Sequence, residues 1–208
     1  KNVFLTSAFK DGLFEVQDAG SQKIGEFLDV KPGMRVVDAC AGAGGKTLHL
    51  AALMENKGQI IAMDIHGWKL AELKRRAKRA GAHNIETREI TDNKVIKRLH
   101  EKADRLLIDA PCSGLGVLKR NPDSKWKIDQ DFIDRIRKEQ ETILQDYSKI
   151  IKKGGKMVYA TCSILPSENN EQVENFLKNN SDFKLVKEEK VMPSTGFDGF
   201  YMALIERV

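Results

Sequence analysis

The sequence predicts an α/β fold built on a mostly parallel sheet. Short apolar runs rich in Val, Ile, Leu or Met alternate with amphipathic helical patterns along most of the chain. A glycine-rich loop directly follows the first of these runs. There is no internal repeat and no Pro/Ser-rich linker, and a chain of 208 residues is long enough to bury a sizeable core. We therefore expect one domain over residues 1–208, of which 1–30 form a lead-in and a covering helix.

The order of the expected elements supports this fold. A covering helix over Ser21 to Leu28 precedes the first strand. The expected strands are Met34 to Asp38, Gln59 to Ile65, Ile85 to Ile90, Ala103 to Ala110 and Lys156 to Ser163. The expected helices between them are Lys46 to Glu55, Gly67 to Ala80 and Asp131 to Lys152, the last ended by a Gly154-Gly155 cap. Strands joined by helical crossovers pair in parallel.

The C-terminal tail follows a different pattern. Phe183 to Lys190 and Phe200 to Val208 are separated by a loop that contains Pro and Gly rather than by a helix. Strands joined in this way pair antiparallel. We expect a hairpin that completes the edge of the sheet.

Composition limits the function classes without selecting one. The 35 Lys and Arg against 30 Asp and Glu give a net charge of +5, which fits RNA binding or simple solubility equally well. Three cysteines are too few for a disulfide framework, and no apolar run is long enough for a membrane span, so we expect a cytoplasmic protein. The histidines lack ligand spacing, and we expect no metal: His49, His66, His83 and His100.

The loop "DACAGAGGKT", residues 38–47, indicates a nucleoside cofactor. A phosphate-binding P-loop would need glycine at Cys40, and a dinucleotide fingerprint would need glycine at Thr47. The remaining pattern, Asp38 followed by Gly42 and Gly44, is typical of S-adenosylmethionine-dependent methyltransferases. A plain strand-to-helix turn remains the alternative.

Carboxylates stand at three further strand ends. Asp64, about 20 residues beyond the glycines, is placed to accept both hydroxyls of a ribose. Asp92 either caps a turn or reaches the exocyclic amine of an adenine. Asp109 closes the fourth strand beside the glycine loop and could meet the amino group of the cofactor's methionine part. Three acidic residues at neighbouring strand ends indicate a nucleoside cofactor more specifically than any one of them alone.

Two cysteines follow neighbouring strands. In the methyltransferase-type strand order 3-2-1-4-5, the fourth and fifth strands lie about 4.8 Å apart, so Cys112 and Cys162 converge beside the proposed methyl donor. Cytosine C5 becomes nucleophilic when a thiolate adds to C6, and a second thiol suits the later proton transfer or elimination. The alternative is that both are small buried hydrophobes. The geometry does not rank the two thiols.

Five segments together resemble the Fmu/Sun (RsmB-like) family of RNA cytosine-C5 methyltransferases: "DACAGAGGKT", "AMDI", "DAPCSGLGVLKRNPDSKW", "YATCSILPSENNEQV" and "DGFYMALI". The likeness begins at "FEVQDAGSQ", residues 14–22. It implies a Rossmann-like methyltransferase fold, Cys162 as nucleophile and Cys112 in product release. It also implies contacts with S-adenosylmethionine from Cys40, Ala41, Gly42, Ala43, Gly44, Gly45, Lys46, Asp64, Asp92 and Asp109.

The resemblance has one departure and leaves the RNA contacts open. The family usually has proline where this chain has Ala43, so we expect a more flexible loop. Lys119, Arg120, Lys125 and Trp126 follow Cys112 and could hold a phosphate or stack on a base; an exposed loop with a packed Trp is the alternative. The cationic run from Lys74 to Arg79 is assigned no role, because such runs are more often solvated.

The sequence therefore predicts a monomer that transfers a methyl group from S-adenosylmethionine to cytosine C5 in structured rRNA or tRNA. A methyltransferase for a non-RNA acceptor would retain turnover in Cys162→Ala. A non-catalytic RNA-binding module would not bind the cofactor. The resemblance also implies an upstream RNA-recognition portion, for which there is little room before Phe14.

Overall fold

The computed structural model describes residues 2–208, apart from the side chain of Thr195. Seven strands form one sheet in the order β3-β2-β1-β4-β5-β7-β6. The first five pair in parallel, which confirms the predicted order 3-2-1-4-5. Their bounds are Arg35–Asp38 (β1), Gln59–Asp64 (β2), Ile85–Glu89 (β3), Ala103–Asp109 (β4) and Ile151–Thr161 (β5).

The last two strands form the expected antiparallel hairpin. They are β6, Phe183–Val191, and β7, Phe200–Arg207, joined through the short turn η4, Pro193–Thr195. Strand β7 also pairs antiparallel with β5, with Tyr159 opposite Ala203. The C-terminal strand therefore lies inside the sheet, and β6 forms its edge.

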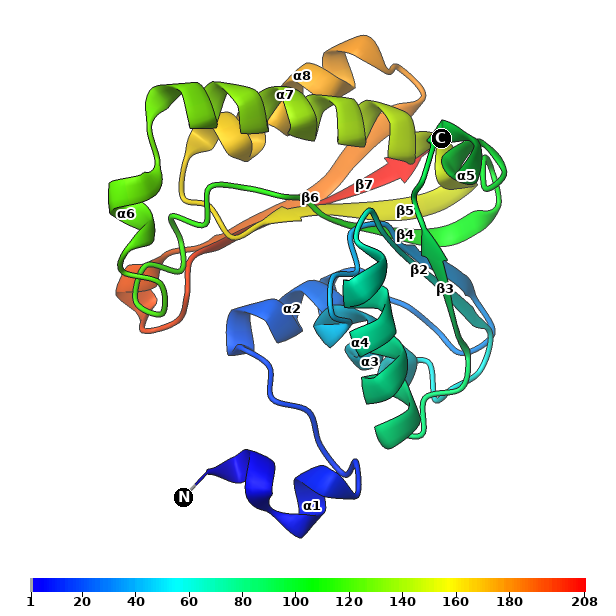
Figure 1. The fold of residues 1–208 in the computed structure, drawn as a ribbon. Coiled ribbons are helices and arrows are strands. Elements are labelled where there is room, and N and C mark those ends of the chain that lie inside the picture. Colours follow the sequence, from blue (N-terminus) through cyan, green and yellow to red (C-terminus); the bar gives the residue numbers. More distant parts are fainter. Residues whose placement is uncertain (1) are drawn as a thin grey trace.

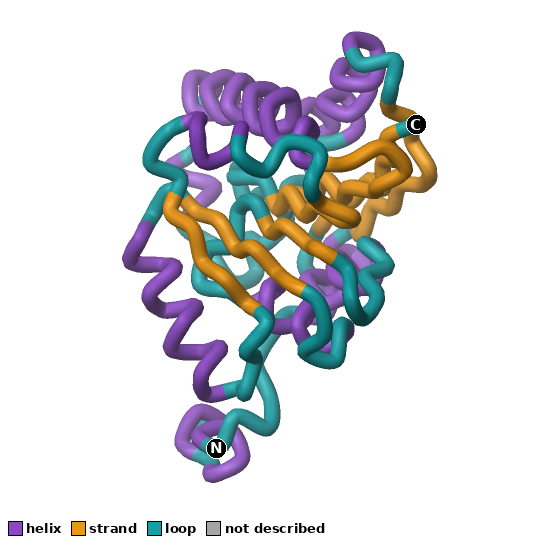
Figure 2. The backbone as a smooth tube through the Cα atoms, turned by 90° about the vertical axis from the view of Figure 1, so that its right-hand side faces the viewer, coloured by secondary structure: helices purple, strands orange, loops and turns teal. Residues whose placement is uncertain are grey.

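Helices cover both faces of the sheet (Figures 1 and 2). One face carries α5, Asn93–Lys97, α7, Gln130–Tyr147, and α8, Asn170–Asn179. The other carries α2, Ala19–Phe27, α3, Gly45–Leu53, and α4, Gly67–Arg79. The short elements are η1 (Val3–Leu5), α1 (Ser7–Lys10), α6 (Ser124–Lys127), η2 (Ser148–Ile150) and η3 (Pro166–Glu168).

Alternation along the strands produces two cores. Val37 and Tyr159 face the helices on the side of α7, where Leu144 is buried. Val36, on the opposite side of β1, packs in the same cluster as Leu50 of α3. Successive strand residues point to opposite faces. Continuous apolar strands are therefore buried on both sides, as the parallel arrangement requires.

The structure corrects the predicted end of the long helix. Helix α7 ends at Tyr147, so a helix continuing to Lys152 was wrong. On β4, Ala103 pairs with Ile151 and Arg105 with Lys156, so the residues between Ile151 and Lys156 form a bulge. Gly154 has a φ of +75° within it. The glycine pair therefore serves a strand bulge and not a helix cap.

Helix α8 was not predicted, although its buried residues Val173 and Phe176 are three positions apart. The other predicted elements agree with the structure to within a few residues. No helix within residues 2–208 combines the length and apolar character that a membrane crossing needs. The same range holds no group of three or more His, Cys, Asp or Glu that could bind a metal ion.

Candidate active site

The glycine loop turns tightly from β1 into α3. Thr47 of α3 donates a hydrogen bond of 2.8 Å to Asp38 at the end of β1. Burial raises the pKa of Asp38 to about 7, although the Thr47 contact opposes this shift. Gly44 has a φ of +89°, and a Cβ there would lie 2.5 Å from Leu73 of α4. The loop thus lies against α4 too closely for any other residue at Gly44.

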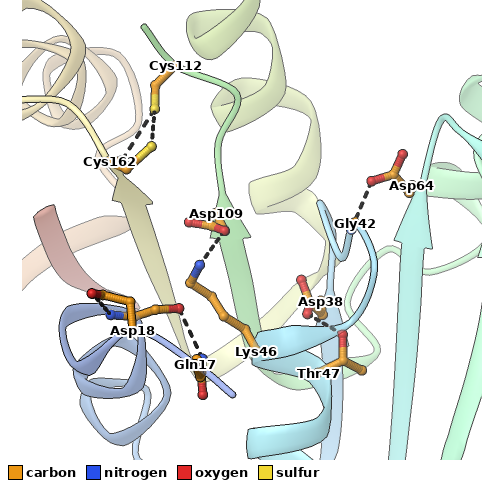
Figure 3. Close-up of polar contacts among 11 residues, drawn as sticks. Gln17, Asp18, Asp38, Gly42, Lys46, Thr47, Asp64, Asp109, Cys112 and Cys162 are labelled. Atoms are coloured by element: carbon orange, nitrogen blue, oxygen red, sulfur yellow. Dashed lines mark hydrogen bonds and ion pairs between the residues drawn. The ribbon is translucent and has the colours of Figure 1, made fainter. Parts of the chain in front are cut away.

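Asp64 connects the end of β2 to the glycine loop. One oxygen accepts from the Gly42 N–H at 2.9 Å, and the other accepts from the His66 N–H at 2.8 Å. A carboxylate has about four acceptor sites, so Asp64 retains capacity for further donors. Figure 3 shows Asp64, at the end of β2, directed toward Gly42 in the glycine loop.

A cavity of about 340 Å³ opens at this edge of the sheet. Four of the predicted cofactor residues line it, namely Cys40, Gly42, Asp64 and Asp109. Its apolar walls come from residues that sequence reasoning missed: Ile65, Ile90, Ile143 and Tyr147. Ile143 and Tyr147 belong to α7, whose place over the cavity depends on tertiary packing. The cavity combines acidic groups with an apolar slot, which fits a nucleoside with polar ends.

The other predicted cofactor residues lie elsewhere. Asp92 caps α5, where its side chain accepts from the Lys94 N–H at 2.7 Å, and it is not among the lining residues. Ala41 is buried against α3 and α4. The Ala43 carbonyl accepts a hydrogen bond of 2.8 Å from Arg76 of α4. This contact restrains the glycine loop at Ala43.

The two predicted thiols meet at the ends of β4 and β5 (Figure 3). Their sulfur atoms lie 3.2 Å apart, and the Cys162 N–H donates to Cys112 Sγ at 3.3 Å. The hydrogen bond from Cys112 lowers the pKa of Cys162, and the charge of Lys46 acts in the same direction. The same contact, together with burial, raises the pKa of Cys112. Cys162 is therefore the thiol that ionises first.

Lys46 and Asp109 form an ion pair of 2.6 Å beside the thiols. Burial alone would lower the pKa of Lys46, but the Asp109 carboxylate more than offsets this effect and the pKa is raised. Lys46 therefore remains charged at neutral pH. Figure 3 shows its side chain reaching from the start of α3 to the end of β4.

A second cavity, of about 310 Å³, has Cys162 in its wall. Lys46 and Asp109 line it as well, so Asp109 borders both cavities. Its other side comes from the segment before α2, including Gln17 and Asp18. Both residues fall within the "FEVQDAGSQ" motif, which was the available sequence signal for them. A thiol, a cation and a carboxylate thus share one cavity, which borders the first cavity at Asp109.

Arg76 attaches the segment before α2 to the glycine loop. It forms an ion pair of 3.0 Å with Glu15, and Arg79 also pairs with Glu15. Arg76 contacts Ala43 as well, and it lines the second cavity. Part of the cationic run of α4 therefore has a structural role that its composition did not reveal.

Of the four predicted RNA contacts, the structure brings one to the site. Arg120 lines the second cavity and pairs with the buried Asp198 at 2.5 Å. Lys119 and Lys125 are exposed, and Trp126 is 81% exposed with the Lys125 ammonium 4.9 Å from its ring centre. The alternative of a packed Trp126 is therefore wrong.

Comparison with known proteins identifies the family of the chain. The family model described as 16S rRNA methyltransferase RsmB/F matches residues 26–205. The chain belongs to the RsmB/F family. Curated relatives include the probable ribosomal RNA small subunit methyltransferase B of Synechocystis, 40% identical over 85% of this chain, and the ribosomal RNA small subunit methyltransferase B of Proteus mirabilis, 35% identical over 99%.

Solved structures agree with the RsmB/F assignment. The crystal structure of PH0851 matches all of this chain with a TM-score of 0.96 and 34% identity. The crystal structure of NSun6 from Pyrococcus horikoshii with SFG matches all of it with a TM-score of 0.91 and 29% identity. This chain spans 40% and 49% of the two curated relatives, and 50% and 56% of the two solved chains.

Proposed function

We propose that this RsmB/F chain transfers a methyl group from S-adenosylmethionine to C5 of a cytosine in small-subunit ribosomal RNA. The observation that carries the proposal is the pair of thiols 3.2 Å apart in the wall of a cavity that shares Asp109 with its neighbour. The names of the relatives support ribosomal RNA as the acceptor.

The first cavity fits S-adenosylmethionine. Asp64 has acceptor capacity for ribose hydroxyls, and Ile65 and Ile90 offer apolar surfaces for an adenine. Asp109 can accept from the ammonium group of the methionine part. When bound, the cofactor supplies an electrophilic methyl group on a sulfonium, which C5 of an activated cytosine can attack.

Cys162 is proposed as the nucleophile. Its pKa is lowered by the Cys112 hydrogen bond and by the charge of Lys46, and the thiolate is the reactive form. Addition of the sulfur to C6 forms an S–C6 bond and moves electron density to C5. When C5 takes the methyl group, the sulfonium S–CH3 bond would break and the remainder of the cofactor would leave as a neutral thioether. A base then removes the C5 proton and the S–C6 bond breaks, which restores the aromatic ring and the thiolate.

Cys112 is proposed to assist release. Its pKa is raised by the contact with Cys162, so it stays protonated while Cys162 is ionised. Once Cys162 is bound to carbon, that contact no longer opposes ionisation of Cys112. Cys112 can then take part in removing the C5 proton or in eliminating the sulfur, because its own sulfur lies 3.2 Å from the Cys162 sulfur that must leave C6.

Lys46 and Asp109 give a physical reason why the second cavity would bind cytosine in preference to uracil. Asp109 presents a carboxylate acceptor and Lys46 a donor to the cavity that contains Cys162. Cytosine carries an amino donor beside a ring-nitrogen acceptor, whereas uracil would place a carbonyl oxygen against the carboxylate. A site built to pair polar groups strongly rejects a ligand that leaves them unpaired.

The test uses the chain and its Cys112→Ala and Cys162→Ala variants with S-adenosylmethionine and small-subunit ribosomal RNA. We expect Cys112→Ala to accumulate a denaturation-resistant protein–RNA adduct and Cys162→Ala to form none. The reverse pattern would make Cys112 the nucleophile. Turnover by Cys162→Ala would indicate a different acceptor, and absence of cofactor binding would indicate a non-catalytic module.

A further inference from the structure

Glu168 is a buried carboxylate between the two cysteine loops. Its side chain is fully shielded from solvent on η3, six residues after Cys162. It accepts from the Ser113 N–H at 2.8 Å, from the Ser113 hydroxyl at 2.5 Å, from Gln140 Nε2 at 3.0 Å and from the Ser163 hydroxyl. All four donors are neutral.

The Cys112 loop is bound on both sides of the thiol. Ser113, directly after Cys112, contacts Glu168 through its backbone and its side chain. Gln140 of α7 contacts Glu168 and also donates to the Pro111 carbonyl at 2.9 Å, directly before Cys112. Glu168 and Gln140 therefore fix the backbone on either side of this sulfur.

The Cys162 loop is bound in the same manner. Ser163, directly after Cys162, donates its hydroxyl to Glu168. Asn169, next to Glu168, accepts from the Thr161 hydroxyl at 2.5 Å and donates to the Ser163 carbonyl at 3.0 Å. The backbone on both sides of this sulfur is thus attached to the Glu168–Asn169 pair.

A carboxylate suits this position because it accepts several hydrogen bonds and donates none when ionised. A glutamine would present an amide N–H₂ to two hydroxyls that now donate. Both hydroxyls would have to rotate and find other acceptors in a buried place, where an unpaired donor is costly. The carboxyl group of Glu168 therefore gathers donors from two loops.

We propose that Glu168 is a positioning residue that keeps the Cys112 and Cys162 sulfur atoms in contact. The proposal rests on the proposed function, because it gives the contact a use: it prepares Cys162 as a thiolate and keeps Cys112 beside the S–C6 bond that must break. Glu168 does not line either cavity, so it acts through the two thiols and not by contact with ligands.

A first experiment needs no RNA. The alkylation rate of Cys162 by iodoacetamide is measured against pH by mass spectrometry in the unaltered chain, in Glu168→Gln and in Glu168→Ala, with S-adenosylmethionine affinity measured by calorimetry. Glu171→Gln is the matched control, because Glu171 is exposed on the neighbouring helix α8. Cys40 is an internal reference, because burial raises its pKa well above the usual value.

We expect the Glu168 variants to move the pH midpoint of Cys162 alkylation upward and to slow alkylation at pH 7 by about tenfold. The reason is that Cys112 would no longer be held where it donates a hydrogen bond to the Cys162 thiolate. Cofactor affinity and the Glu171→Gln profile should not change. The effect should be larger in Glu168→Ala than in Glu168→Gln, which retains one acceptor oxygen. Unchanged profiles in both Glu168 variants would overturn the proposal.

A second experiment remains informative if the Glu168 variants fold poorly. It also separates this proposal from the proposed function. Ser113→Ala and Ser163→Ala each remove one hydroxyl contact, and each should shift the alkylation profile upward by less than Glu168→Ala. With RNA and cofactor, both should lengthen the life of the protein–RNA adduct. If the unaltered chain forms no adduct, the proposed function fails, while the alkylation profiles still decide whether Glu168 positions the thiols.

Discussion

Lys46 affects Cys162 through charge. It does not bond to the sulfur, yet its positive charge lowers the pKa of Cys162, while Asp109 opposes it. Lys46 and Asp109 form an ion pair of 2.6 Å, and their opposite charges act on the Cys162 thiol in opposite directions. The reactivity of the thiol therefore depends on keeping the pair intact.

Lys46→Met should raise the pKa of Cys162, because it removes the cation and leaves the Asp109 charge unbalanced. We expect alkylation of Cys162 at pH 7 to slow by about tenfold, as one pKa unit implies. Lys57→Met is the control, because Lys57 pairs with exposed Glu55 in a surface turn. An unchanged alkylation rate in Lys46→Met would contradict the electrostatic role.

Asp38 makes the stability of the fold depend on pH. Its pKa rises from 3.8 to about 7 on burial, so the unfolded chain ionises at a lower pH than the folded chain does. The stability that the fold has when Asp38 is protonated is fully present below pH 4 and is lost as the pH rises through 7. Asp38→Asn should therefore gain stability relative to the unaltered chain over this window, on the order of a few kcal/mol.

Denaturant unfolding at pH 5 and at pH 8 measures this difference. We expect the advantage of Asp38→Asn to be larger at pH 8. A constant difference at both values would show that Asp38 does not titrate in this window.

At the scale of elements, local patterns predicted the strands better than the helix ends. The periodicity of α7 runs on into Ser148 and Ile150, so nothing in the sequence marks Tyr147 as the last residue of the helix. Gly154-Gly155 suits a helix cap and a bulge equally, and pairing with β4 selects the bulge. Convergence of the thiols was predictable from strand order, whereas the Glu168 contacts depend on how η3 folds back.

Gly116 is the point where three loops pack on one another. Its N–H donates to the Cys162 carbonyl at 2.9 Å, and its carbonyl accepts from the Gly199 N–H at 2.8 Å. A Cβ there would lie 2.2 Å from the Gly199 oxygen and 2.7 Å from the Cys162 oxygen. Only glycine lets these backbones approach so closely.

Gly116→Ala should lower the melting temperature by several degrees, because a backbone clash costs about 1–3 kcal/mol. Gly45→Ala is the matched control, since nothing lies within 4 Å of a Cβ at that helical position. Differential scanning calorimetry compares the two. Equal melting temperatures in the two variants would mean that the loops around Gly116 can move apart to admit a methyl group without loss of stability.

For the molecule as a whole, Glu15 attaches the segment before α2 to α4 through ion pairs with Arg76 and Arg79. Arg76→Ala should loosen this attachment while the sheet stays folded, because only one of the two ion pairs of Glu15, that with Arg79, would remain. We expect faster hydrogen exchange in residues 13–18 and weaker RNA binding. Arg75→Ala is the control, because Arg75 is largely exposed and pairs with Glu72. Equal exchange in the two variants would show that the segment is held by other contacts.

The interior position of β7 has a consequence for synthesis of the chain. Strand β7 comes last of the seven, yet it separates β5 from β6 and brings Phe200 to the second cavity. While the chain is growing on the ribosome, the first five strands can associate, but β6 has no neighbour to pair with until β7 has emerged. The second cavity is therefore completed last, so a nascent chain can assemble the end of the sheet that lines the first cavity well before the second cavity is closed.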